Sequence, residues 1–158
     1  MADQAVSTSS ASIFMDDLRS SISGECNYTP VTADDDGWVY SESGVSHSGT
    51  DILATDRSYL GQSGAVHTND KIKWIAIKNV STTPTEGIGI SISGGDAAYD
   101  TTDTIILGNG EMVVLKVPNL TVTGLHGKSC TLDSNGKPSA QGTATVNIQI
   151  AAILEDVA

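Results

Sequence analysis

The second half of the chain alternates apolar and polar residues with a period of two, which is typical of a half-buried β-strand. Ile88, Ile90 and Ile92 alternate with glycine and serine. The segment 144–154 is the most regular of these patterns, and one of its faces carries Ala144, Val146, Ile148, Ile150, Ala152 and Leu154. Each segment is therefore predicted to be a strand with one face in a core.

The segment KIKWIAIK is apolar on both faces. Ile72, Trp74 and Ala76 lie on one face of an extended chain, and Ile75 and Ile77 lie on the other. Since both faces avoid water, we expect a strand whose middle is buried on both sides.

Two turn sequences divide this half of the chain. The β-rich runs 104–107 and 111–117 flank Gly108-Asn109-Gly110. Asn and Gly readily adopt positive φ, so the pattern predicts a β-hairpin. The polar run 133–138 (DSNGKP) predicts a second tight turn.

The middle of the chain gives weaker signals. Trp38-Val39-Tyr40 predicts a short aromatic strand, and residues 44–70 predict a long loop with one or two short strands. After Pro118, a further short strand is expected around Leu120, Val122 and Leu125. Roughly eight short strands separated by turns predict an all-β domain, a β-sandwich or jelly roll, over residues 25–158.

The N-terminal segment 1–24 is predicted to be an arm with a short helix. Its first ten residues are small and polar, and Ala11–Ile22 brings apolar residues near helical spacing. The apolar residues are Ile13, Phe14, Leu18 and Ile22. They either pack on their own domain or dock on a neighbouring subunit, so they are the candidate partner-binding residues.

Charge narrows the choice of partners. The chain has 158 residues and a formal net charge of −11, with 17% charged residues. An acidic surface repels phosphate backbones and anionic lipids, so we expect no nucleic-acid or membrane partner. No apolar run approaches the ~18 residues of a membrane span. The opening MADQAVSTSS lacks the pattern of an export signal, so a protein made and kept in a cytoplasm is expected.

Known catalytic motifs are missing from the sequence. It contains no G-x-S-x-G, no phosphate-binding G-x-x-x-x-G-K-[ST] and no H-E-x-x-H. His47, His67 and His126 stand apart in polar sequence and are interpreted as surface residues. We therefore expect a protein that is not an enzyme, with no catalytic residue, cofactor or metal site.

Two smaller features leave alternatives open. The run Asp34-Asp35-Asp36 is either a solvated acidic loop, which is favoured, or a Ca²⁺ ligand set. Cys26 and Cys130 are expected to be free thiols, as is usual without an export signal, although a disulfide would close a long loop.

The runs KIKWIAIKNVS, GIGISISGGD, TIILGNGEMVVLKVP and TVNIQIAAILEDVA carry a family resemblance. Over about residues 71–158 the chain resembles small structural proteins of tailed bacteriophages, the capsid decoration or cement proteins. The resemblance implies a β-sandwich or jelly-roll protein made in the host cytoplasm. It also implies a place on the capsid surface of the virion, where the protein bridges subunits of the major capsid protein, commonly as a homotrimer.

Two other functions are considered. A receptor- or glycan-binding module of a head fibre or tail spike would present an exposed aromatic cleft around Trp38 or Tyr40. A small enzyme on a jelly roll would bring two carboxylates or histidines into one pocket.

Overall fold

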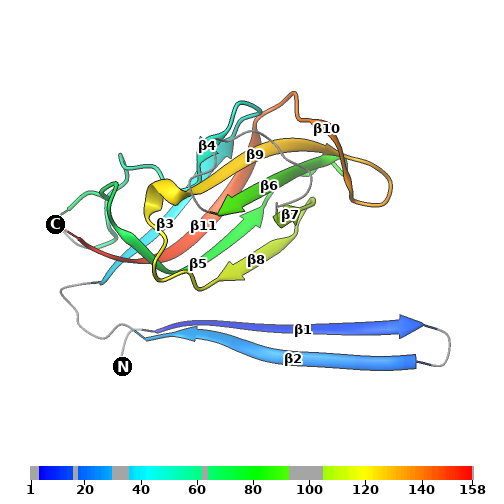
Figure 1. Ribbon diagram of the computed structural model, residues 1–158, viewed down its shortest axis with the longest axis horizontal. Coiled ribbons are helices and arrows are strands. Elements are labelled where there is room, and N and C mark those ends of the chain that lie inside the picture. Colours follow the sequence, from blue (N-terminus) through cyan, green and yellow to red (C-terminus); the bar gives the residue numbers. More distant parts are fainter. Residues whose placement is uncertain (1–3, 16–17, 30–35, 62–63, 93–104, 158) are drawn as a thin grey trace.

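The computed structural model describes the chain except for residues 1–3, 16–17, 30–35, 62–63, 93–104 and 158. The described residues form strands and one 3₁₀ turn, Val122–Gly124 (Figure 1). The strands are β1 (Ala5–Met15), β2 (Leu18–Tyr28), β3 (Asp36–Val45), β4 (Thr50–Asp51), β5 (Lys71–Asn79), β6 (Glu86–Ile92), β7 (Ile105–Leu107), β8 (Met112–Leu115), β9 (Leu125–Leu132), β10 (Pro138–Gln141) and β11 (Val146–Glu155).

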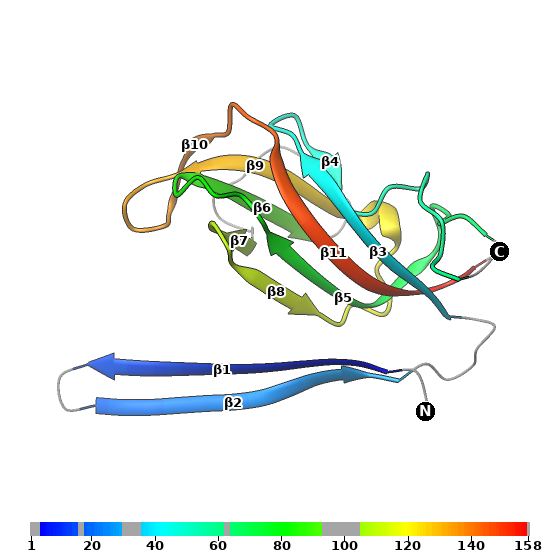
Figure 2. The ribbon, with the colours of Figure 1, turned by 180° about the vertical axis from the view of Figure 1, so that it is seen from behind.

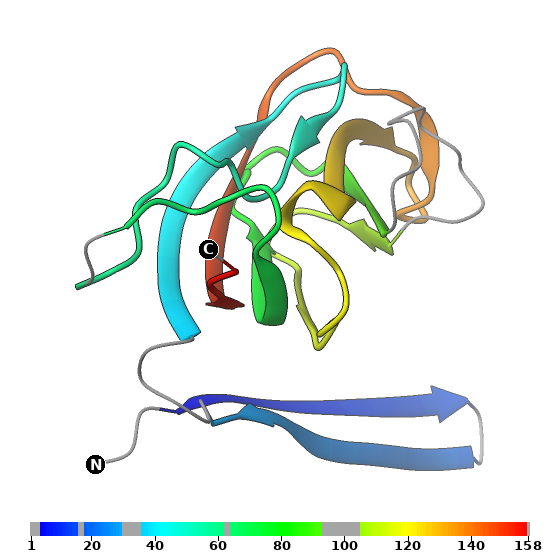
Figure 3. The same cartoon turned by 60° about the vertical axis from the view of Figure 1, so that its left-hand side comes forward.

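Two antiparallel sheets form a sandwich (Figures 1 and 3). One has the strand order β3-β11-β5-β8, and the other has the order β10-β9-β6-β7 with β4 also paired to β9. The inward faces meet in a core rich in Ile, Val and Leu, in which Ile75, Ile88 and Ile148 are fully buried. The all-β sandwich prediction is therefore confirmed.

The strand predicted at 71–78 is confirmed as β5, but the side chain of Ile72 lies on the face opposite to the one predicted. Ile72 lies in the core between the sheets, whereas Trp74 lies on the outer surface of its sheet. The register against β11 shifts here: Ile153 pairs with Trp74 and Leu154 pairs with Ile72, so Lys73 is an extra residue. A bulge of this kind interrupts the period of two, which the sequence pattern assumes to be unbroken.

The predicted hairpin around Gly108-Asn109-Gly110 is wrong in its pairing. The turn exists, with Gly110 at a φ of 74° and its N–H donating to the Asn79 carbonyl at 3.1 Å. However, β7 pairs with β6 and β8 pairs with β5, so the chain crosses here from one sheet to the other. A turn sequence specifies a change of direction and leaves the partner of each strand to the packing of the core.

Between β8 and β9 the strand expected around Leu120, Val122 and Leu125 is also displaced. Val122–Gly124 is a 3₁₀ turn, and the strand begins at Leu125.

The turn predicted at 133–138 is confirmed. There the Asp133 carboxylate accepts the backbone N–H groups of Lys137 and Asn135 at 2.9 and 2.8 Å, which lowers the pKa of Asp133.

The helix predicted within Ala11–Ile22 is wrong, because this region belongs to an antiparallel hairpin. β1 and β2 pair from Ala5↔Tyr28 to Met15↔Leu18 and form a two-stranded sheet of their own beneath the sandwich (Figure 2). The apolar spacing suggested a helix, but serine is frequent in and around the segment, at positions 7, 9, 10, 12, 20, 21 and 23. Serine is a weak helix former whose side chain competes for backbone hydrogen bonds. Pairing the two segments supplies those bonds instead.

Candidate functional site

The hairpin arm, defined as β1 and β2 (Ala5–Tyr28), touches the sandwich at its base. Ala5, Cys26 and Tyr28 pack against Trp74 and Ile153 on the outer face of the β3-β11-β5-β8 sheet. The Trp74 indole Nε1 donates a hydrogen bond of 3.2 Å to the Cys26 carbonyl. This small apolar cluster fixes the arm to the domain.

Beyond the base, the described part of the arm is open to solvent. Residues 8–12 and 21–25 are all exposed. Directly paired residues of an antiparallel ladder point to one face, so Ala11 and Ile22 share the face of Ala5, Cys26 and Tyr28. Ile22 is 75% exposed. The face that is covered at the base therefore continues outward past Ser7, Ser9 and Gly24 to Ala11 and Ile22, where it is open to solvent.

The four candidate partner-binding residues all lie in this arm. Ile13 and Phe14 belong to β1, and Leu18 and Ile22 belong to β2. In the ladder Ile13 is opposite Ser20 and Leu18 is opposite Met15. Among the four side chains, the structure describes that of Ile22 alone. All four positions therefore lie in the outer half of the arm, away from its base.

The outer face of the β3-β11-β5-β8 sheet also has an uncovered apolar part. A shallow groove is lined by Tyr40, Ala76, Lys78, Met112, Gln149, Ile150 and Ala151. Tyr40 and Met112 are each 55% exposed. The neighbouring Trp38 is half-buried in the cluster at the arm's base, so the two aromatic rings do not form one exposed platform.

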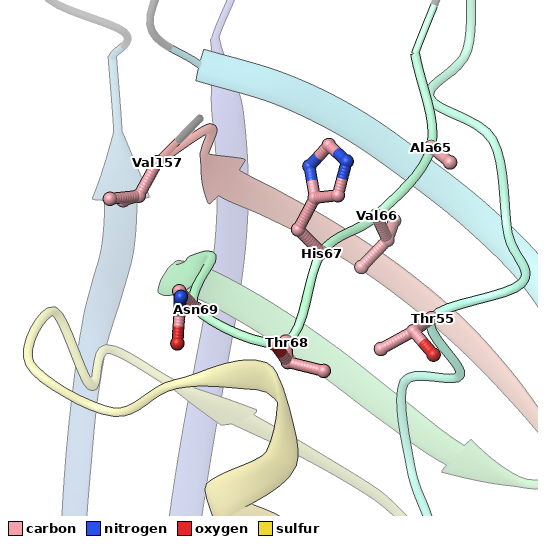
Figure 4. A pocket seen from close by; sticks show the side chains of 7 residues that line it. All are labelled: Thr55, Ala65, Val66, His67, Thr68, Asn69 and Val157. Atoms are coloured by element: carbon pink, nitrogen blue, oxygen red, sulfur yellow. The ribbon is translucent and has the colours of Figure 1, made fainter.

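A second hollow lies at the end of the sandwich near the C-terminal segment. It is lined by Thr55, Ala65, Val66, His67, Thr68, Asn69 and Val157 (Figure 4). Beside it, His67 Nδ1 lies 4.0 Å from Asp70 Oδ1 and 3.7 Å from Asp156 Oδ1. One ligand atom from each of these residues lies within 4.8 Å of the other two, which is close enough for them to share a metal ion.

Asp70 is the buried member of this group. Its Oδ2 accepts the Tyr59 hydroxyl and the His67 backbone N–H at 2.7 Å, and its Oδ1 accepts the Val157 N–H at 3.2 Å. Burial, and then the hydrogen bond to Asp70, raise the pKa of Tyr59 far above its ordinary value. Tyr59 therefore remains a protonated donor.

Sequence reasoning treated His67 as an isolated surface residue and missed this group. His67 and Asp70 are three residues apart before β5, but Asp156 follows β11, so only the folded chain brings it near. Of the other histidines, His126 Nδ1 lies 2.8 Å from Asp51 Oδ1 across the β4–β9 pair, and His47 is exposed. The one available sequence signal was the His-x-x-Asp spacing before a strand.

No family model matches the chain, and no curated protein or solved structure matches it. Within the described residues, no helix has the length and apolar character needed to cross a membrane.

Proposed function

We propose that this protein is a structural protein of a virus particle, a decoration protein that attaches to the capsid and bridges subunits of the major capsid protein. The observation that carries the proposal is the hairpin arm. It has eleven residues in each strand, and it contacts the sandwich at its base. A lone two-stranded hairpin is marginally stable in water, so an arm of this length implies a surface on another chain that covers it.

The topology supports the proposal independently. A jelly roll consists of eight strands in two sheets and recurs in viral capsid proteins. The order β3-β11-β5-β8 facing β4-β9-β6-β7 interleaves early and late strands, which supports a jelly roll as the form of the sandwich. This likeness concerns the fold class, so the assignment to a capsid rests on the arm and on the sequence resemblance together.

The arm's composition fits attachment to a protein surface. Its outer part presents Ile22 among serines and carries little charge in the described residues. Many weak contacts of this kind, repeated over a particle with many copies, give strong overall attachment. Self-association into a trimer belongs to the same proposal, because the groove around Tyr40 and Met112 offers a further uncovered apolar surface.

Two alternatives are less well supported. The groove around Tyr40 has one exposed ring and few polar groups, whereas sugar-binding sites need several hydrogen-bonding side chains. The convergence of His67, Asp70 and Asp156 resembles an enzyme site, but Asp70 accepts hydrogen bonds from Tyr59, His67 and Val157. Those bonds connect the loop before β5 to the segment after β11, which is a structural role.

The test is co-sedimentation of the purified protein with capsids of the virus that encodes it. Ile22→Asp should reduce bound protein at least tenfold, because a charge on the arm's apolar face must be desolvated on docking. Ser21→Asp is the matched control, since it adds the same charge one residue away on the opposite face, and it should bind normally. If Ile22→Asp binds as well as the wild type, the arm does not attach the protein.

Light scattering completes the test. A stable trimer in solution supports the decoration role. A strict monomer at all concentrations, together with binding to a glycan array, would favour the receptor-binding alternative.

A further inference from the structure

The end of the sandwich carries a group of side chains that the attachment function does not use. His67 and Asp70 lie in the loop that precedes β5, and Asp156 lies just after β11. We propose that these three residues bind one divalent transition-metal ion, of which Zn²⁺ is the representative.

The first argument is charge. Asp70 is completely buried, and the groups that hydrogen-bond to it are a phenol and two backbone N–H groups, all neutral. The ion pair that the structure gives Asp70 is with His67, which is a counter-charge only when it is protonated. With His67 neutral, the buried carboxylate has no counter-charge in this pair, which is strongly unfavourable. Asp156 adds a second negative charge nearby, and a divalent cation would balance both.

The second argument is geometry. Zinc binds imidazole nitrogen and carboxylate oxygen at ~2.0–2.2 Å, so two ligand atoms of a tetrahedral site stand about 3.4 Å apart. The separations from His67 Nδ1 are 3.7 and 4.0 Å. The three ligand atoms lie within 4.8 Å of one another, and the side chains of His67 and Asp156 are 56% and 36% exposed, so both can move inward to close the site. Their exposure also leaves room for water ligands.

The third argument is the way in which Asp70 is held. Tyr59 and the His67 N–H both bond to Oδ2, which fixes the plane of the carboxylate. Oδ1 accepts one hydrogen bond, from Val157, and keeps further acceptor capacity on the side of His67 and Asp156. Metal-ligating carboxylates are commonly oriented by such outer hydrogen bonds.

The ligand types select the kind of ion. One imidazole with two carboxylates suits Zn²⁺ and its first-row neighbours. Calcium prefers six to eight oxygen ligands and magnesium a shell of oxygens, so neither ion fits three residues that include a histidine. The bound ion would join the loop before β5 to the segment after β11. Its expected role is to stabilise this end of the sandwich.

The experiment uses the full chain, freed of metal with EDTA and dialysed. Isothermal titration with ZnCl₂ should show one ion bound per chain. Zn²⁺ at about one hundred times its Kd should raise the Tm by several degrees. CaCl₂ and MgCl₂ at the same concentration should leave the Tm unchanged.

Two variants and one control identify the site. His67→Asn keeps the backbone N–H that supports Asp70, and Asp156→Asn changes an exposed side chain, so both should fold. Each should weaken Zn²⁺ binding at least tenfold. His47→Asn removes an exposed histidine elsewhere and should bind Zn²⁺ normally. Absence of Zn²⁺ binding to the wild type, or unchanged binding in both variants, would overturn the proposal. Capsid attachment is measured separately, so the two proposals can fail independently.

Discussion

The indole N–H of Trp74 donates to the carbonyl oxygen of Cys26 at 3.2 Å, which connects the middle of β5 to the hairpin arm. Trp74→Phe keeps an aromatic ring in the cluster but removes this donor. Because an intramolecular hydrogen bond contributes about 1 kcal/mol, the arm's base should open more often while the sandwich stays folded.

Hydrogen exchange of the Cys26–Tyr28 amides measures this opening. Exchange should be about five-fold faster in Trp74→Phe than in the wild type, as expected for about 1 kcal/mol. Trp38→Phe removes an indole from the same cluster and serves as the control. Equal exchange in Trp74→Phe and the wild type would mean that the hydrogen bond does not hold the arm.

Asn79 is a fully buried polar residue at the crossing between the two sheets. Its Nδ2 donates to the carbonyls of Glu86 and Leu107, both at 3.2 Å, and its Oδ1 accepts the Ser81 N–H at 2.9 Å. Asn79→Leu leaves these three backbone groups without a side-chain partner. The expected loss is about 3 kcal/mol, since unsatisfied buried groups cost 1–3 kcal/mol each and relaxation recovers part.

Urea denaturation measures this loss as a lower midpoint with an unchanged slope. Asn147→Leu, at an exposed position of β11, should change the free energy of unfolding by less than about 0.5 kcal/mol. A loss in Asn79→Leu no larger than that of the control would contradict the assigned role.

Gly37, at the start of β3, is covered by the ring of Tyr59. A Cβ at this position would overlap the ring carbons of Tyr59, whereas a Cβ at Gly24 in the arm would have nothing within 4 Å. Gly37→Ala must therefore displace Tyr59 from Asp70, and it should cost about 1–3 kcal/mol of stability. Gly24→Ala should be neutral. Calorimetry should show a Tm lower by several degrees in the first variant, and equal Tm values would refute the assignment.

Cys130 should resist chemical modification. Burial raises the pKa of its thiol to about 11, and the thiolate is the reactive form. At pH 8 iodoacetamide should therefore label Cys26, which is half-buried, well before Cys130. Since the folded pKa is raised, the protonated thiol favours the fold below the ordinary pKa of 9.0, and this contribution is lost as the pH rises toward about 11. Peptide mass spectrometry of the labelled protein distinguishes the two sites.

Much of the sandwich could be predicted because apolar and polar residues alternate along its strands. β11 alternates from Val146 to Ala151, and Val146, Ile148 and Ile150 are buried as expected. Local patterns could not predict pairing. The Gly-Asn-Gly turn looked like a hairpin, but the partners of β7 and β8 are fixed by β6 and β5. The bulge at Lys73 places Ile72 on the face of β5 opposite to the one predicted, because the register of β5 depends on the neighbouring strand β11.

The hairpin arm and the group formed by His67, Asp70 and Asp156 show a different limit of prediction from sequence. Ile13, Phe14, Leu18 and Ile22 were selected as partner-binding residues on a helical spacing, although the segment is a hairpin. The selection as candidates rested on their apolar character in a polar arm, which does not depend on the secondary structure. Asp156 could not have been placed beside His67 from sequence, because their proximity depends on the full path of the chain between them.

The position of β11 constrains how the protein is made. This strand lies between β3 and β5, although every other strand precedes it in the chain. While the ribosome is still translating β11, β3 and β5 have exposed edges and no neighbour between them. The β1–β2 arm pairs locally and can form early, whereas the sandwich must wait for its central strand. Such long-range pairing slows folding, so nascent chains should depend on chaperones until β11 leaves the ribosomal tunnel.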